Sequence, residues 1–146
     1  PDVIAGTATG AIGWAALVAE RLGLPFVYVR SQAKGHGAKK RVEGDIPHGK
    51  DIVLIEDLFS TGGSAISSVE ALREEVDGNV SDVIAIFTYE MLASTEKAQS
   101  ASVKLHPLAS LSILLKVAGD QGRLTKEDIS KVAEFSSDPK AWGEKL

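Results

Sequence analysis

Residues 52–64 read Ile-Val-Leu-Ile-Glu-Asp-Leu-Phe-Ser-Thr-Gly-Gly-Ser, and this stretch decides both the fold and the site. The four apolar residues 52–55 are typical of a central parallel strand that is covered on both faces. Two carboxylates, Glu56 and Asp57, end this run, and a turn rich in Ser, Thr and Gly follows. A helix is predicted to begin at Ser64. A buried strand, a short polar loop and a helix form the repeating unit of α/β proteins.

Strand and helix signals alternate along the rest of the chain. Further strands are predicted over 3–5, 26–29, 83–87 and 103–105, and helices over 14–22, 64–75, 93–101, 110–118 and 125–135. A long loop with several cations spans 31–50. The pattern predicts an α/β fold, with a mostly parallel central sheet flanked by helices and residues 1–146 forming a single core domain. Because the chain opens in a predicted buried strand, we expect an upstream segment to be absent from these residues.

Composition excludes several classes of function. The chain has 146 residues and no cysteine, which excludes a disulfide framework, thiolate zinc sites and cysteine nucleophiles. Its net charge of −4 argues against a general nucleic-acid binder. No apolar run approaches the roughly 20 residues that a membrane helix needs, and we expect no signal peptide. We therefore expect a cytoplasmic protein with neither nucleic acid nor membrane as a partner.

The polar end of the 52–64 stretch predicts a sugar-phosphate site. Ligands of open α/β sheets bind at the carboxyl ends of strands, where Glu56 and Asp57 emerge. Glycines allow backbone N–H groups to approach an anion, and the start of a helix adds a partial positive charge. The loop is thus expected to hold a phosphate, while the carboxylates accept hydrogen bonds from hydroxyls or help to hold a cation. A plain turn with Ser64 as a helix cap is the alternative, which the strand and the two acids before it make less favourable.

A second polar stretch follows the strand predicted at 26–29. It reads Arg-Ser-Gln-Ala-Lys-Gly-His-Gly over residues 30–37, and further cations follow at 39–41. Glycines flank His36, so we expect a flexible cationic loop that closes over a polyanion. A solvated charged loop is the alternative.

These stretches resemble the type I phosphoribosyltransferases. Residues 52–64 are similar to the ribosyl-diphosphate binding motif of that family, and residues 6–12 are similar to its diphosphate-binding turn. The spacing Arg30-x-x-x-Lys34-x-His36-Gly37 resembles the catalytic loop of the orotate branch, and the resemblance covers nearly the whole chain. It implies transfer of the 5-phosphoribosyl group from 5-phosphoribosyl 1-diphosphate to orotate, which yields orotidine 5'-phosphate and diphosphate in UMP biosynthesis.

The resemblance also implies roles for individual residues. Lys34, His36 and Asp57 would be catalytic, and Ser60 would contact orotate. The sugar diphosphate would be bound by Arg30, Lys34, His36, Glu56, Asp57, Leu58, Phe59, Ser60, Thr61, Gly62, Gly63 and Ser64, and its diphosphate by the turn of Thr7, Ala8 and Thr9. Mg²⁺ would be the cofactor, held mainly through the substrate and not by a protein metal site. A homodimer is implied, with the 30–37 loop shared across subunits, and the family's N-terminal hood lies outside these residues.

Three departures bear on the base. Ser31 and Gly10 stand where many orotate enzymes carry lysine, and Thr88 and Tyr89 occupy a region where some carry an arginine. Another type I phosphoribosyltransferase, for a purine or uracil, is therefore an alternative. A non-catalytic regulator on the same fold, such as an RNA-binding pyrimidine sensor, is a second alternative, although acidic charge and 5% aromatic content weigh against it. The chain could also bind the sugar diphosphate without turning it over.

Overall fold

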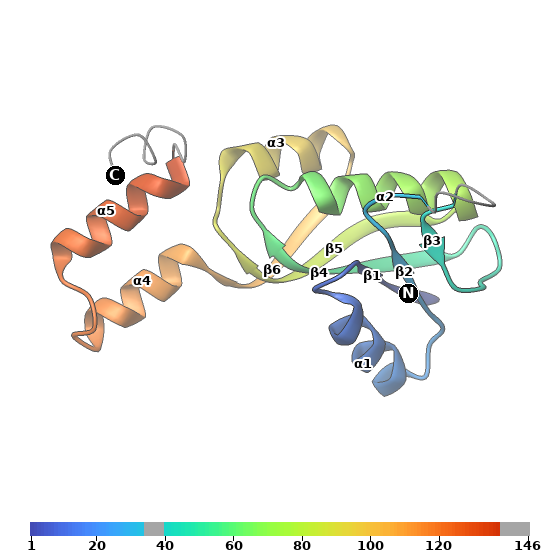
Figure 1. Cartoon of the computed structure of the whole chain (residues 1–146), viewed down its shortest axis with the longest axis horizontal. Coiled ribbons are helices and arrows are strands. Elements are labelled where there is room, and N and C mark those ends of the chain that lie inside the picture. The colour runs from blue at the N-terminus through green and yellow to red at the C-terminus, as the bar shows by residue number, and fades with distance from the viewer. Residues whose placement is uncertain (34–39, 138–146) are drawn as a thin grey trace.

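A parallel sheet forms the centre of the protein (Figure 1), in a computed structural model that describes residues 1–33 and 40–137. Within these residues the sheet has six strands in the order β3-β2-β1-β4-β5-β6. The strands are β1 Val3–Thr7, β2 Phe26–Val29, β3 Val42–Glu43, β4 Asp51–Phe59, β5 Asn79–Thr88 and β6 Lys104–Ser110. All neighbours pair in parallel except β3, which pairs antiparallel with β2 at the edge.

Helices cover the two faces of the sheet unequally (Figure 1). The helices are α1 Ile12–Leu22, α2 Gly63–Val76, α3 Leu92–Ser100, α4 Leu111–Asp120 and α5 Lys126–Ser137. Helix α1 lies against one face, and α2 and α3 lie against the other, while α4 and α5 extend beyond the β6 side of the sheet. No helix in the described part of the chain combines the length and apolarity needed to cross a membrane.

The larger core lies between the sheet and α2. Val69 and Leu72 of α2 pack there with Leu54 of β4 and Val83 of β5, all at 0% exposure. The smaller core joins α1 to the opposite face, where small side chains allow a close approach. A Cβ added to Gly6 of β1 would lie 2.8 Å from the Cβ of Ala15 in α1, so only glycine permits this packing.

Apolar side chains remain exposed outside these cores. Trp14 and Leu17 of α1 are 54% and 63% exposed, and Ile113 and Leu114 of α4 are 59% and 53% exposed. Helices α1 and α4 therefore leave part of their apolar surface uncovered within the described chain.

The predicted fold class is confirmed, but several boundaries were wrong. β4 does not end before the acids: it continues to Phe59, with Glu56 opposite Ala85 and Phe59 opposite Thr88 in the ladder to β5. β5 and β6 are also longer than predicted. The reason is that backbone hydrogen bonds hold a ladder together, so polar side chains do not end it. The two-residue strand β3 was not predicted, since a run this short has no periodicity to detect.

Candidate substrate site

Two loops meet at the carboxyl edge of the sheet. β1 and β4 are adjacent and parallel, with Gly6 opposite Ile55, so both strands end at the same edge. Residues 7–11, here called the β1–α1 turn, follow one strand, and residues 60–64, the β4–α2 loop, follow the other. The structure thus brings together the two segments in which the sequence predicted anion binding.

The β1–α1 turn is held by backbone hydrogen bonds. The Ala8 N–H donates to the carbonyl of Val29 at 2.8 Å, and the Ala11 N–H donates to the carbonyl of Thr7 at 3.1 Å. The Ala8–Thr9 peptide bond is cis. Thr9 is exposed, as a ligand contact requires, whereas Thr7 is buried and its hydroxyl donates to Ser68 Oγ at 3.3 Å. The Thr7 hydroxyl is thus bonded within the protein, and the binding of diphosphate by the turn of Thr7, Ala8 and Thr9 stays a prediction.

The β4–α2 loop leaves the first N–H groups of α2 uncapped. Gly62 occupies the N-cap position in the left-handed region, with φ 73°, and no side chain caps the helix. A Cβ at Gly62 would also lie 3.1 Å from Cα of Ser94 in α3, so the loop passes close to that helix. Thr61 and Ser64 are exposed beside the uncapped amides. The uncapped N–H groups and the Thr61 hydroxyl are donors available to an anion, whereas Ser64 donates its hydroxyl to Glu56.

The two acids of β4 face different surroundings. Asp57 is exposed, whereas Glu56 is only 2% exposed. Glu56 Oε2 accepts the Ser64 hydroxyl at 3.0 Å, and Oε1 accepts the Asp57 N–H at 3.1 Å. Burial raises the pKa of Glu56 to about 7, the Asp57 side chain adds to this, and hydrogen bonds from Ser64, the Asp57 backbone and Thr7 oppose it. Glu56 therefore has partners for both carboxyl oxygens within the protein, and the contact of both acids with a ribose stays a prediction.

Asp57 rests against the β1–α1 turn. A Cβ added to Gly10 would lie 1.8 Å from Asp57 Oδ2, so the glycine provides the space that this carboxylate occupies. The exposed carboxylate therefore stands beside the β1–α1 turn and directly before the β4–α2 loop. This is the position that a polyol carrying an anionic group at each end requires.

Leu58 and Phe59 were predicted among the residues that bind the sugar diphosphate, and the structure places both side chains in or beside the core. Phe59 is 1% exposed in the larger core, and Leu58 is half-buried in β4. The Phe59 carbonyl accepts the Tyr89 N–H at 3.0 Å and the Thr88 hydroxyl at 3.4 Å. The donor-bearing part of the stretch is therefore residues 60–64.

The predicted cationic residues are only partly described. Arg30 follows β2, and its Nη1 lies 3.3 Å from Glu43 Oε1 in an ion pair that leaves the arginine side chain 37% exposed. Lys34 and His36 lie outside the described residues. Their roles remain predictions.

One cation at the site was missed by the sequence reasoning. Nζ of Lys97, an exposed residue of α3, lies 3.6 Å from the position of a Cβ on Gly63 at the start of α2. A groove of about 490 Å³ between α2 and α3 includes both residues in its lining. No local signal distinguishes Lys97, because a single lysine in a polar helix is ordinarily a solvated residue.

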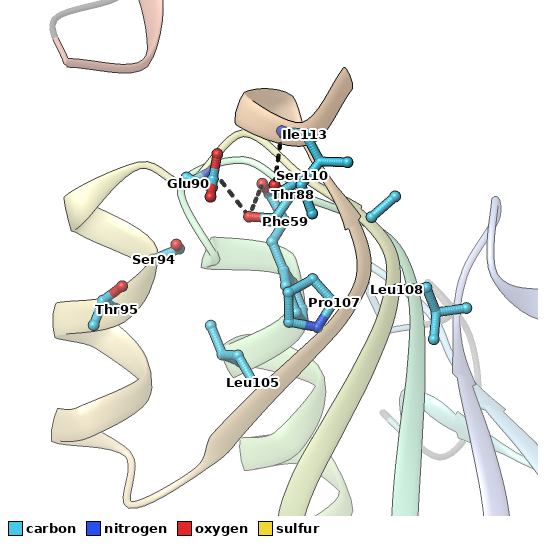
Figure 2. Close-up of a pocket in the computed structure, with 11 residues that line it drawn as sticks. Phe59, Thr88, Glu90, Ser94, Thr95, Leu105, Pro107, Leu108, Ser110 and Ile113 are labelled. Carbon is cyan, nitrogen blue, oxygen red and sulfur yellow. Dashed lines mark hydrogen bonds between the residues drawn. The ribbon is translucent and has the colours of Figure 1, made fainter. Parts of the chain in front are cut away.

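A separate cavity lies between α3 and β6 (Figure 2). It measures about 390 Å³, with Leu105 and Pro107 on one wall and Ser94 and Thr95 on the other. The Thr88 hydroxyl at its end accepts the Glu90 N–H at 3.0 Å. Every buried side-chain N or O atom in the described chain has a hydrogen-bond partner, so none is left aimed at a ligand here.

The site could hold a metal ion only together with the substrate, because the protein itself offers few ligands. Among residues 1–33 and 40–137, no three His, Cys, Asp or Glu side chains group together as a metal site would require. The exposed carboxylate of Asp57 would supply one oxygen ligand. Mg²⁺ keeps several waters and binds readily through substrate phosphates, so a single carboxylate beside a bound diphosphate fits this ion.

Comparison with known proteins identifies the family of this chain. Residues 1–106 match the family model described as phosphoribosyl transferase domain. The chain is 46% identical over 143 residues to an orotate phosphoribosyltransferase of Bacillus cereus, which covers 97% of this chain and 68% of the relative. It is 43% identical to that of Cutibacterium acnes, covering 98% and 66%. The crystal structure of orotate phosphoribosyltransferase from Aeropyrum pernix aligns with a TM-score of 0.72 at 35% identity, over 81% of this chain and 65% of that one. The chain therefore spans about two thirds of the length of these relatives.

Proposed function

The chain belongs to the phosphoribosyltransferase family, in its orotate branch, and we propose that it carries out phosphoribosyl transfer from 5-phosphoribosyl 1-diphosphate to orotate. One observation carries this proposal. The exposed Asp57 carboxylate lies against Gly10 of the β1–α1 turn and directly precedes the β4–α2 loop. A ribose with a phosphate at one end and a diphosphate at the other matches this order of acceptor and donor groups.

The reaction is a displacement at C1 of the ribose. The bond from C1 to the diphosphate oxygen breaks and diphosphate leaves with the electron pair, while a ring nitrogen of orotate forms the new bond to C1 and releases its proton to water or to the departing diphosphate. Positive charge grows on the ribose ring and negative charge on the leaving group. Asp57 stabilises the first through the ribose, while donors of the β1–α1 turn and the cations of residues 30–37 stabilise the second.

Magnesium belongs to the same proposal. Mg²⁺ bound to the diphosphate would neutralise charge on the leaving group. Asp57 is the described side chain placed to orient that ion or its waters. A cytoplasmic location is proposed with it, which is consistent with a chain that contains no cysteine.

The direct test measures diphosphate release and orotidine 5'-phosphate formation from 5-phosphoribosyl 1-diphosphate and orotate, with and without Mg²⁺. Adenine, hypoxanthine and uracil are offered in parallel. We expect turnover with orotate and a large loss of rate when Mg²⁺ is removed. Faster turnover with another base would overturn the assignment of orotate, and tight binding of the sugar diphosphate without turnover on any base would overturn the assignment of catalysis.

We also propose a homodimer in which the 30–37 loop acts on the partner's site, as the resemblance to the orotate branch implies. Asp57→Asn and Lys34→Ala should each lower turnover by roughly 100-fold or more. Asp57 is exposed, so its substitution should change the free energy of unfolding by no more than about 0.5 kcal/mol. An equimolar mixture of the two variants, after subunit exchange, should recover about a quarter of the wild-type rate, because half the dimers then hold one intact site.

The mixture distinguishes the arrangements of the loop. If each loop serves its own subunit, no mixed dimer holds an intact site and the rate stays at that of the single variants. A sedimentation-velocity measurement on the same mixture serves as the control that dimers are present.

A further inference from the structure

We infer that Arg41 is a positioning residue that holds Arg30 beside the β1–α1 turn, and that through Arg30 it sets how tightly the diphosphate end of the substrate is bound. The inference rests on the proposed function, because it assigns Arg41 to the leaving-group side of that reaction. It starts from the place where β2 ends.

Arg30 leaves the sheet next to the β1–α1 turn. Val29, the last residue of β2, lies opposite Thr7 of β1, and its carbonyl accepts the Ala8 N–H at 2.8 Å. Arg30 follows directly, and its side chain is 37% exposed, with Nη1 at 3.3 Å from Glu43 Oε1. A guanidinium has five N–H donors, so this ion pair leaves donors for an anion bound at the turn.

Both backbone polar groups of Arg30 are bonded to Arg41. The Arg30 N–H donates to the Arg41 carbonyl at 2.9 Å, and Nε of Arg41 donates to the Arg30 carbonyl at 2.8 Å. The second bond comes from a charged donor, and such bonds are shorter and stronger than those between neutral groups. The position of the Arg30 backbone therefore depends on a residue that lies 11 places later in the chain.

Helix α2 holds Arg41 in turn. Nη1 of Arg41 donates to the carbonyl of Ser67 at 3.1 Å and to its hydroxyl at 2.9 Å, in the second turn of the helix. In the last turn, the Glu75 carboxylate accepts the N–H groups of Arg41 and Val42 at 2.9 Å. One guanidinium thus joins the end of β2 to α2, which the planar fork of arginine allows and the single amine of lysine does not. Arg30 is thereby fixed to the helix whose first turn borders the site.

The decisive experiment compares two ligands that represent opposite ends of the substrate. Isothermal titration of the whole chain uses inorganic diphosphate and ribose 5-phosphate, each in the presence of Mg²⁺, on wild type and Arg41→Met. This variant keeps the N–H that Glu75 accepts and removes the guanidinium. A positioning role predicts that Arg41→Met weakens diphosphate by on the order of tenfold and leaves ribose 5-phosphate unchanged. Equal weakening of both ligands, or unchanged diphosphate binding, would overturn the inference.

A double variant shows whether Arg41 acts through Arg30. Arg30→Ala should weaken diphosphate at least as much as Arg41→Met does, and the variant with both substitutions should bind it no more weakly than Arg30→Ala alone. Additive losses would mean that Arg41 acts on the diphosphate by another route, such as its own charge, and would contradict the inference.

Arg73→Met is the matched control, because Arg73 also extends from α2 to backbone carbonyls, those of Val80 and Ala101. Urea unfolding should show a lower free energy of unfolding for both Arg41→Met and Arg73→Met, whereas only Arg41→Met should weaken diphosphate. A comparable loss of diphosphate affinity in Arg73→Met would show that the effect follows from lower stability alone, and the inference would be wrong.

A second measurement needs no ligand. Native-state hydrogen exchange of Arg41→Met is compared with wild type at the amide of Arg30 and, as a control, at the amide of Ile66 within α2. We expect faster exchange at Arg30 and no change at Ile66, because only the first amide loses its anchored partner. Unchanged exchange at Arg30 would overturn the inference.

Arg41→Lys, which keeps the charge, takes the place of Arg41→Met in both measurements if the latter does not fold. If wild type bound neither ligand, the proposed function would fail, while the exchange data would still decide whether Arg41 holds Arg30.

Discussion

At the scale of single residues, Lys97 of α3 places a positive charge beside the β4–α2 loop, which is distant from it in the sequence. The β4–α2 loop supplies uncapped N–H groups, which are neutral donors for the phosphate that we propose binds there. Lys97 adds a positive charge from α3, beside Gly63. Its contribution should therefore be electrostatic, and more sensitive to salt than that of the loop itself.

Lys97→Ala should weaken ribose 5-phosphate by roughly 3- to 10-fold at low salt, and the difference from wild type should shrink at about 1 M salt, where the screening length is short. Isothermal titration at two salt concentrations measures both effects. Lys104→Ala is the matched control, since Lys104 is an exposed lysine at the opposite, amino end of β6. Equal losses in the two variants would show that Lys97 acts only through the overall charge of the protein.

At the scale of elements, α2 is the part that connects the site to the rest of the fold. Its first turn borders the site, while residues of its last turns bind other elements. Arg73 donates to the carbonyls of Ala101 and Val80, and both oxygens of Glu75 accept the Arg41 N–H at 2.9 Å. The helix is thus fixed to β5 and to the end of α3 independently of its N-terminal contacts.

Arg73→Ala should lower the free energy of unfolding by roughly 2 kcal/mol, because two carbonyls lose a charged donor. The affinity for ribose 5-phosphate should change little, since Arg73 lies more than two turns from the loop. Urea unfolding and isothermal titration provide the two readouts. Arg123→Ala is the control, because the exposed side chain of Arg123 donates to the side chain of Gln121 and to no carbonyl among the bonds described for it. A loss of affinity as large as the loss of stability would contradict this separation.

At the scale of the whole molecule, the pKa values of the carboxylates make stability depend on pH in two opposite ways. Hydrogen bonds lower the pKa of Asp82, chiefly from Ser81 and then from His106, and the pKa of Glu90, chiefly from the backbone of Ser112. The stability that these groups contribute is present at neutral pH and is lost as the pH falls. Glu56 behaves in the opposite way, because burial raises its pKa to about 7.

The difference in the free energy of unfolding between wild type and Glu56→Gln should therefore change with pH. The folded state holds a proton on Glu56 up to a pKa of about 7, whereas the unfolded state loses it near 4.5. The contribution of this group is complete below pH 4.5 and is lost as the pH rises through 7. The glutamine of Glu56→Gln stays neutral at every pH. The free energy of unfolding of this variant, relative to that of wild type, should therefore rise by roughly 2 to 3 kcal/mol between pH 4.5 and 8.

Urea unfolding of both proteins at pH 5 and pH 8 measures this difference. The contributions of Asp82 and Glu90 are common to the two proteins and cancel. A constant difference across the pH range would show that the pKa of Glu56 is not raised.

The amino-acid sequence by itself determined the class of fold and the location of the site along the chain. The apolar run at 52–55, the small-residue loop before Ser64 and the regular alternation of strand and helix signals are local patterns. Local patterns reflect backbone preferences and the need to bury one face, which act within a few residues. For that reason the predicted elements exist in the structure, while their ends differ wherever pairing with a neighbouring strand continues through polar residues.

Only the tertiary structure decided which residues of the candidate site are buried and which are exposed. Consecutive residues of a strand face opposite sides, so one of Glu56 and Asp57 had to be buried, but which one depends on where α2 packs. Three other contacts likewise join segments that are far apart in the sequence: Gly10 with Asp57, Thr7 with Ser68, and Gly63 with Lys97. Such contacts arise from the packing of whole elements against each other, which no local pattern encodes.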